Sequence, residues 1–387
     1  MPILYSGVQY SGMWTRQQQA QAIAAGTWPG LSLLYGWGRN NTQYPAIGLN
    51  NTTSYSSPKQ TGNLTGDWAK ISAVASGSTV AVKTNGTLWS WGYGIQGALG
   101  YAGSYISSPK QVGALTDWLS VTSGYNFCLA IKTNGTLWSW GYNAQGQLGH
   151  GDVTYLSSPK QVGSLTTWLL TACGAYHALA IKTDGTLWAW GFNSFGQLGL
   201  NDTISRSSPV QVGALTTWSK IAGGRNCSIV IKTDGTLWAW GTNFYGQLGL
   251  GNTTYYSSPK QVGALTTWST IAGGNFQTVA IKTDGTLWTW GRNNVGQLGL
   301  GNSITYSSPK QVGTLTTWNA LHTDGALSTS TFAIKTDKTL WAWGGNLRGQ
   351  LGLGNTADYF SPKQVGALAN WTQVSNGGDT TIATLST

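Results

Sequence analysis

Apolar and polar positions along the chain follow one pattern that returns about every 50 residues. Each unit contains a short apolar run that ends in a lysine (SIVIKT), an Asp-Gly or Asn-Gly pair, and a segment of strict alternation (TLWAWG). Short runs rich in Val, Ile and Trp are typical of strands, and the pair between them predicts a hairpin. We expect a two-residue turn with both central residues at positive φ.

Each unit adds one strand on either side of this hairpin. The first strand follows an opening tryptophan (WSKIAGG), and the fourth carries SSPxQV. Because proline cannot donate to a central ladder, we expect the fourth strand at the outer edge of its sheet. The phrase LWxWG occurs six times, and a degenerate copy, LLYGWG, ends at Gly38. Four short strands repeated at this spacing predict a β-propeller.

The two ends of the sequence supply complementary halves of one unit. The segments WTQVSNGG and TTIATLST provide its first two strands, while LSLLYGWG and SSPKQTG provide the other two. Six complete units and this shared unit make seven. We therefore expect an all-β fold, a seven-bladed β-propeller over residues 31–387 that is closed by the shared N-/C-terminal blade. A separate segment with a short helix precedes it over residues 1–30.

The repeated string resembles a known family. LAIKTDGTLWAWGFNSFGQLG, followed by SSPxQV, is similar to the repeats of the regulator of chromosome condensation family, over about residues 31–387. The resemblance implies a seven-bladed propeller that acts as an exchange factor, an adaptor or an ultraviolet-B photoreceptor. Exchange activity in the family depends on an inserted loop, and light sensing on a Gly-Trp-Arg-His-Thr signature. The units of this chain are regular and the signature is absent, so we expect neither activity.

Composition and charge exclude several classes of protein. Glycine (55 residues) and tryptophan (22) are abundant, only 8% of the chain is charged and no Glu is present, which excludes a disordered chain and a coiled coil. No apolar run approaches the roughly 18 residues of a membrane helix, and no signal peptide precedes the repeats.

The formal net charge of +10 comes largely from two repeated lysine positions, in IKT and in SPK. Symmetry spreads these lysines around rings, which we interpret as solvated. Because nucleic-acid binding needs a concentrated basic surface, we expect no nucleic-acid partner.

Catalytic and metal-binding patterns are nearly absent. The three cysteines and three histidines have no metal-ligand spacing, and the cysteines are expected to be buried reduced thiols. No HExxH, Walker or GxSxG string occurs. One GxGxxG string begins at Gly92, but no βαβ unit surrounds it, so we interpret it as a turn. We expect no enzyme activity, no metal and no cofactor.

Strand direction divides the loops between two faces of the propeller. The GGxxx loop after the first strand and the xNxx loop after the third share an upper face, whereas the Asp-Gly turns share a lower face. Among the units the lower turns hardly vary, while the upper loops, including Asn126, vary most. Aromatic residues and Arg are enriched in binding hot spots. The candidate binding residues are Tyr125, Phe127, Tyr142, Tyr176, His177, Phe192, Phe195, Arg225, Phe244, Tyr245, Phe276, Arg292 and Arg348. The alternative is that exposed loops drift without a function.

Residues 1–30 lie outside the repeat. A capping-box pattern, TRQQ, predicts a helix over 16–25. Because an isolated helix of this length is not stable in water, it should dock on the lower face or on another protein. We take Trp14, Ile23 and Trp28 as its anchor residues.

The segment SGMWTRQQQAQAIAAGTWPG resembles short N-terminal pieces of structural proteins of tailed phages, cyanophages among them. This resemblance implies a virion setting in which residues 1–30 bind other virion proteins. We therefore expect a non-enzymatic virion protein that is assembled in the host cytoplasm and forms part of a tail, baseplate or fibre. Its variable face would recognise a host cell-surface glycan or protein, without inserting into a membrane. A homo-oligomer within the particle is compatible with this role. The alternatives are a head decoration protein and a cellular propeller adaptor or exchange factor.

Overall fold

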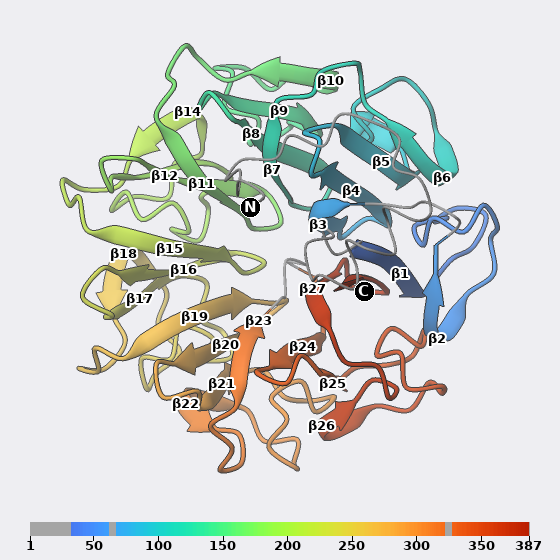
Figure 1. Cartoon of the computed structure of the whole chain (residues 1–387). Helices are drawn as coiled ribbons and strands as arrows, with labels where there is room; N and C mark the ends of the chain where they lie inside the picture. The colour runs from blue at the N-terminus through green and yellow to red at the C-terminus, as the bar shows by residue number, and fades with distance from the viewer. Residues whose placement is uncertain (1–31, 62–66, 322–326, 387) are drawn as a thin grey trace, which may run out of the picture.

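The computed structural model describes residues 32–61, 67–321 and 327–386 and arranges them in a ring of seven four-stranded antiparallel sheets (Figure 1). We number as blades 1 to 6 the six sheets made of consecutive strands, and as blade 7 the sheet that combines the two ends. The predicted seven-bladed propeller with a shared blade is confirmed. The predicted helix over 16–25 and the residues Trp14, Ile23 and Trp28 lie outside the described ranges. Within those ranges, no helix has the length and apolar character needed to cross a membrane.

Every blade has one strand at each of four positions, and the strands at each position follow in the order of blades 1 to 7. The innermost strands are β3 (Trp68–Val74), β7 (Trp118–Ser123), β11 (Trp168–Cys173), β15 (Trp218–Gly223), β19 (Trp268–Gly273), β23 (Trp318–Leu321) and β27 (Trp371–Asn376). The second strands are β4 (Ser78–Lys83), β8 (Phe127–Lys132), β12 (His177–Lys182), β16 (Cys227–Lys232), β20 (Gln277–Lys282), β24 (Ser330–Lys335) and β28 (Thr380–Ser386). The third strands are β5 (Leu88–Tyr93), β9 (Leu137–Gly141), β13 (Leu187–Gly191), β17 (Leu237–Gly241), β21 (Leu287–Gly291), β25 (Leu340–Gly344) and β1 (Ser32–Gly38). The outermost strands are β6 (Tyr105–Gln111), β10 (Leu156–Gln161), β14 (Arg206–Gln211), β18 (Tyr256–Gln261), β22 (Tyr306–Gln311), β26 (Tyr359–Gln364) and β2 (Tyr55–Gln60). The 3-10 turn η1 (Ile95–Gly97) occupies the GxGxxG string, which is therefore a turn, as predicted.

The tryptophans of each unit hold neighbouring blades together. In blade 3, Trp168 packs edge-to-face on Trp188 and Trp190, with ring centroids 5.9 and 6.2 Å apart. Trp190 is fully buried and donates its indole N–H to the carbonyl oxygen of Gln147 in blade 2, at 2.9 Å. Burying one indole removes on the order of 200 Å² from water. The alternation in TLWAWG therefore turns the pair of tryptophans toward the preceding blade, and the equivalent indole bond recurs at all seven interfaces of the ring.

The Asp-Gly hairpin is longer than the predicted two-residue turn. Between β12 and β13, Gly185 donates its N–H to Lys182 O at 2.9 Å, and Lys182 donates to Thr186 O at 3.1 Å. Gly185 has a φ of +76°, but Asp184 is not at positive φ. Instead the Asp184 carboxylate accepts hydrogen bonds from the Thr186 backbone N–H and hydroxyl, at 2.9 and 2.6 Å. This side-chain cap stabilises a turn with a single left-handed residue, so the prediction of two was wrong.

The SSPxQV strands lie at the outer edge of their sheets, as the proline predicted (Figure 1). In blade 3, β14 pairs with β13 at Gln211 and Val210, and again at Arg206, with an irregularity between them that contains Pro209. Proline has no N–H to offer at this point, so the irregular edge costs the ladder no further hydrogen bond.

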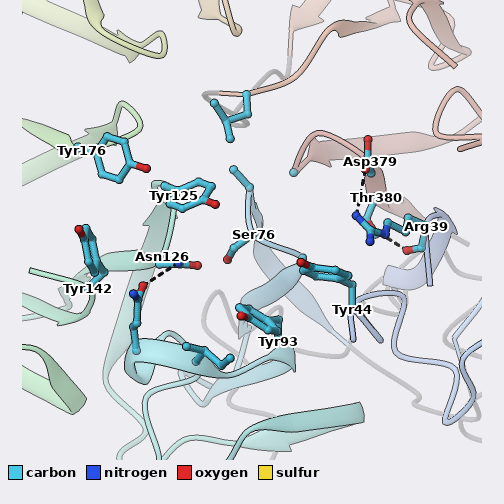
Figure 2. Close-up of a pocket in the computed structure, with 16 residues that line it drawn as sticks. Arg39, Tyr44, Ser76, Tyr93, Tyr125, Asn126, Tyr142, Tyr176, Asp379 and Thr380 are labelled. Atoms are coloured by element: carbon cyan, nitrogen blue, oxygen red, sulfur yellow. Dashed lines mark hydrogen bonds and ion pairs between the residues drawn. The ribbon is translucent and has the colours of Figure 1, made fainter. Parts of the chain in front are cut away.

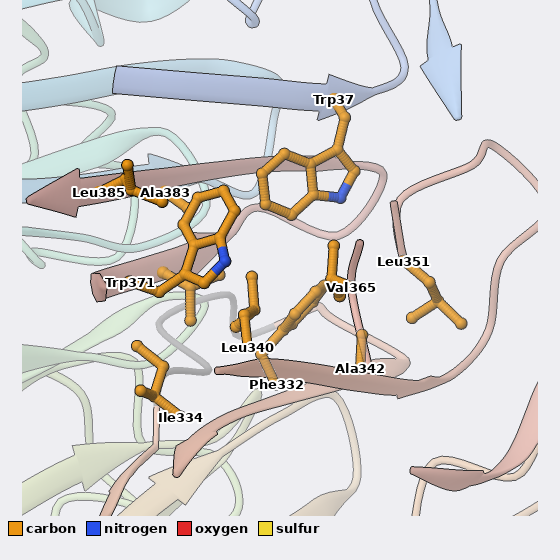
Figure 3. Close-up of a cluster of buried hydrophobic side chains, with 11 residues drawn as sticks. Trp37, Phe332, Ile334, Leu340, Ala342, Leu351, Val365, Trp371, Ala383 and Leu385 are labelled. Carbon is orange, nitrogen blue, oxygen red and sulfur yellow. The ribbon is translucent and has the colours of Figure 1, made fainter. Parts of the chain in front are cut away.

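Blade 7 closes the ring by pairing strands from the two ends of the chain, and a cluster of buried hydrophobic side chains lies at this junction (Figure 3). Strands β1 and β28 pair over seven residues, from Ser32 opposite Ser386 to Gly38 opposite Thr380. The side chain of Trp37 lies in a buried cluster with Trp371, at a centroid distance of 6.1 Å, and the cluster includes Phe332 and Leu340 of blade 6. The kind of tryptophan packing that joins the other blades therefore also stabilises the pairing of β1 with β28, which we call the seam.

The prediction of solvated lysine rings was wrong for the IKT lysines, which are buried or half-buried. The Nζ atom of Lys182 lies 3.6 Å from the ring centroid of Trp188 and 4.9 Å from that of Trp168, and the residue is 7% exposed. Burial lowers the pKa of Lys182, and Asp184 raises it. The Nζ atoms of all six IKT lysines lie over two tryptophan rings in this way, which allows cation–π attraction. The SPK lysines are exposed, as predicted. The three cysteines are buried, as expected.

Candidate functional site

The upper face is built on loops whose repeated Asn and Gln side chains point inward. In blade 3 the side chain of Asn193 is fully buried and accepts the backbone N–H of Leu198 at 2.9 Å. Gln197 Oε1 accepts the N–H of Phe195 at 3.0 Å. These buried amides hold the xNxxGQLG loop in shape, and they leave the variable positions, such as Phe192, free to project from it.

A cavity of about 420 Å³ opens on this face (Figure 2). Much of its lining comes from the hairpins between first and second strands of blades 1, 2, 3 and 7, which places it at the upper mouth of the propeller axis. Five tyrosines surround it, and we call it the tyrosine pocket: Tyr44, Tyr93, Tyr125, Tyr142 and Tyr176. Its volume lies within the roughly 300–1,000 Å³ that is usual for small-ligand sites.

Two buried polar atoms of residues that line the tyrosine pocket have no hydrogen-bond partner among the described residues. They are Ser76 Oγ and Asn126 Oδ1, and their residues are 8% and 6% exposed. The amide nitrogen of Asn126 is engaged, since it donates to Gln96 Oε1 at 2.8 Å. In Figure 2, Ser76 and Asn126 face the space beside Tyr125. The described residues contain fourteen buried side-chain atoms without a hydrogen-bond partner, and these two are the ones whose residues line the tyrosine pocket. Most buried polar groups in folded proteins have a partner, so the two atoms call for an explanation.

The far side of the tyrosine pocket carries an ion pair. Arg39 lies 3.5 Å from the Asp379 carboxylate, and its guanidinium lies 4.0 Å from the centroid of Tyr44 (Figure 2). Burial raises the pKa of the Tyr93 and Tyr142 hydroxyls, and neighbouring tyrosines raise it further. These phenols are therefore neutral at physiological pH, and the charges of Arg39 and Asp379 offset each other.

A second group of candidate residues gathers on blades 4 and 5. Phe244 packs on Tyr245 at 4.8 Å between centroids, and Tyr245 packs on Phe276 at 5.1 Å. The guanidinium of Arg225 lies 5.4 Å from the Phe276 ring, and that of Arg292 lies 5.1 Å from the Tyr245 ring. We call these five residues the arginine–aromatic cluster.

Phenylalanines continue the aromatic surface from the tyrosine pocket across blade 3. Tyr176 contacts Phe192 at a centroid distance of 6.5 Å, and Phe192 contacts Phe195 at 5.8 Å. Phe195 reaches Tyr255 of blade 4 at 6.1 Å. Phe195 and Phe244 are 36% and 64% exposed, so this face presents large apolar side chains to solvent.

Three predicted site residues do not join these groups. Phe127 and His177 begin the second strands of their blades and are completely buried, so the prediction that they line the upper face was wrong. The His177 ring points between blades and forms a hydrogen bond with Ser228 Oγ at 3.1 Å. Arg348 is exposed on blade 6, beside a smaller cavity of about 230 Å³ that it shares with Asp358.

The pocket also contains residues that the sequence pattern did not single out: Arg39, Tyr44, Ser76, Tyr93 and Asp379. Most of them lie in the degenerate units around the seam, where the repeat is hardest to align. Tyr93 follows LWSWG just as Tyr142 and Phe192 follow their own copies, so this position alone carried a signal that could have found it.

Comparison with known proteins identifies the fold. The family model described as the RCC1-like domain matches residues 33–383. The structure of human WBSCR16 superposes with a TM-score of 0.81 at 20% identity, covering 92% of this chain and 98% of that one. The structure of Prp20p from Saccharomyces cerevisiae, described with its binding to Gsp1p and histones, superposes with a TM-score of 0.80 at 19% identity, covering 92% of each chain.

No curated protein matches the sequence. The family match begins at residue 33, so the resemblance of residues 11–30 to phage segments gains no support from these comparisons.

Proposed function

The chain belongs to the RCC1-like domain family, and we propose that it is a non-enzymatic virion protein of a tailed phage whose upper face recognises a ligand on the host surface. The contrast between its two faces carries the proposal. The lower turns repeat almost unchanged from blade to blade, whereas the variable upper positions bring aromatic and arginine side chains into contact.

If the upper loops varied without any function, contacts between variable positions of different blades would not be favoured. Tyr142 of blade 2 packs on Tyr176 of blade 3, and Tyr245 of blade 4 packs on Phe276 of blade 5. Tyrosine and arginine provide large contact area and directional polar groups, which is why they are frequent in binding hot spots.

The setting in a virion rests on the resemblance of residues 11–30 to phage structural proteins, and residues 1–30 are proposed to attach the propeller to a tail, baseplate or fibre. A head decoration protein would use the same attachment without binding the host. A cellular adaptor or exchange factor is the candidate from another class, and it has the shared fold with WBSCR16 and Prp20p in its favour.

The proposal is tested with purified protein, whole host cells, and phage particles that lack the protein. We expect binding to cells, with at least a tenfold loss when Phe244 and Tyr245 are both replaced by alanine. The matched control replaces Leu215 and Leu265, which are 46% and 48% exposed beside the lower turns, and it should bind as wild type. Binding to particles alone would identify a decoration subunit. Binding to neither would favour the cellular adaptor.

Deletion of residues 1–30 tests the attachment separately. The truncated propeller should bind cells as before but should no longer enter particles. Unchanged incorporation would contradict the anchor.

A further inference from the structure

We propose that the tyrosine pocket binds one neutral pyranose sugar, the recognised unit of a host-surface glycan. This inference rests on the proposed function and specifies the ligand of its upper face. It starts from Ser76 Oγ and Asn126 Oδ1, the two buried polar atoms that have no partner among the described residues and lie in the pocket lining.

The hydrogen-bonding capacity of Ser76 Oγ and Asn126 Oδ1 matches a ligand with hydroxyl groups. Asn126 Oδ1 is an acceptor only, and its orientation is held by the bond from its own amide to Gln96. Ser76 can donate one hydrogen bond and accept others. Neighbouring hydroxyls on a sugar ring can donate to Asn126 and both donate to and accept from Ser76. Unmade hydrogen bonds of buried groups are costly, so a ligand that completes them gains affinity and specificity.

The tyrosines supply the complementary apolar surface. Tyr125 packs at 5.4 Å on Tyr176, which lies 6.0 Å from Tyr142, and in Figure 2 the Tyr125 ring lies beside the space that Ser76 and Asn126 face. The negatively polarised face of an aromatic ring attracts the C–H groups of a pyranose, which are slightly positive. A sugar ring thus meets an aromatic wall on one side and polar atoms at its edge.

The charges in the pocket favour a neutral sugar over an ionic ligand. The guanidinium of Arg39 is already paired with Asp379, and it also lies over Tyr44. A carboxylate or phosphate would have to compete with Asp379 for this cation. A quaternary ammonium ion would suit the aromatic rings but has no hydrogen to donate to Asn126 Oδ1.

The experiment uses the full-length protein and six probes: the methyl pyranosides of glucose, galactose and mannose, N-acetylglucosamine, glucuronate and choline. Saturation-transfer NMR detects contact, and titration gives dissociation constants. We expect at least one neutral sugar to bind more tightly than glucuronate and choline. If none of the neutral sugars binds at about 10 mM, or if either ion binds more tightly than all of them, the inference is wrong.

Variants locate the bound sugar. Ser76→Ala should weaken sugar binding about fivefold, equivalent to the loss of about one net hydrogen bond. Its melting temperature should be unchanged or higher, because the substitution removes an unsatisfied hydroxyl. Tyr125→Ala should weaken binding at least fivefold. Leu215→Ala, at a residue that is 46% exposed beside the lower turns and lies outside the pocket lining, is the control and should leave sugar binding unchanged. Equal binding by Ser76→Ala, Tyr125→Ala and wild type would place the sugar elsewhere and overturn the inference.

The inference and the proposed function fail in different ways. If wild-type protein binds host cells but none of the neutral sugars, the pocket assignment fails and host recognition survives. If a neutral sugar binds in the pocket but cells are not bound, the host-surface function fails and the sugar site survives.

Discussion

Replacement of Trp37 by phenylalanine tests the idea that blade 7 is a non-covalent seam. The indole N–H of Trp37 donates to Gln350 O at 2.7 Å, and the side chain is completely buried against blade 6. Thr381 Oγ1 donates to the same carbonyl at 2.8 Å, so the substitution removes one hydrogen bond without leaving the carbonyl unpaired. The lost bond contributes about 1 kcal/mol, and the missing part of the ring about 2 kcal/mol.

Trp290→Phe in blade 5 is the matched control. Trp290 is equally buried and donates to Gln247 O at 2.9 Å, and Thr278 Oγ1 donates to that carbonyl at 2.8 Å. The two substitutions therefore remove the same contacts. They differ in chain connection, because β20 and β21 are joined by a hairpin whereas β1 and β28 meet only through strand pairing.

Hydrogen exchange followed by mass spectrometry distinguishes the two sites. A local loss of about 3 kcal/mol corresponds to roughly 100-fold faster opening. We expect this increase in residues 32–38 and 380–386 of Trp37→Phe, and a much smaller one in β20 and β21 of Trp290→Phe. Equal exchange rates at the two sites would refute the reasoning that the seam opens as a separate unit.

Two further predictions concern the lower turn and the buried histidine. Gly185→Ala should lower the free energy of unfolding by more than about 3 kcal/mol, because φ is +76° and the new Cβ would collide with the Thr216 carbonyl oxygen. Gly163→Ala, at φ +61° with open space around it, should lose only about 1 kcal/mol, and equal urea midpoints for the two variants would contradict the collision. Burial lowers the pKa of His177 to about 3, below the roughly 6.5 of the unfolded chain, so the unfolded state takes up the proton first. Stability should be complete above about pH 6.5 and fall as the pH drops toward 3, by up to about 1.4 kcal/mol per unit. His177→Gln, which copies Gln277 of blade 5, should flatten this dependence in urea titrations, and an unchanged pH profile would show that other groups cause it.

The sequence predicted the architecture because a propeller is specified locally. Each blade needs a hairpin signal, an alternating strand and an edge proline, and all three recur at a fixed spacing in the chain. Closure also followed from sequence, because the incomplete units at the two ends complement each other. The hairpin type did not follow, since the Asp184 carboxylate caps the turn and relieves the need for a second left-handed residue.

The candidate site was predicted only in part. Variation among the upper loops identified Tyr125, Tyr142 and Tyr176, and the structure places all three around one pocket. The same variation also assigned Phe127 and His177 to the exposed upper loops, but both begin second strands and are completely buried. Every residue of β8 and β12 is buried, whichever face of the sheet it points to, so a position assigned to the loop that belongs to the start of a second strand is covered by protein.

The burial of the IKT lysines and the existence of the tyrosine pocket were decided by tertiary structure alone. Whether Lys182 is solvated depends on two tryptophans that only the folded sheet brings beside it. Ser76 and Asn126 belong to different blades, and their unpartnered atoms become significant only because closure of the ring places Arg39 and Asp379 on the far side of the same cavity. Local periodicity thus determines the blades, whereas the meeting of unlike loops around the axis determines what the upper face can bind.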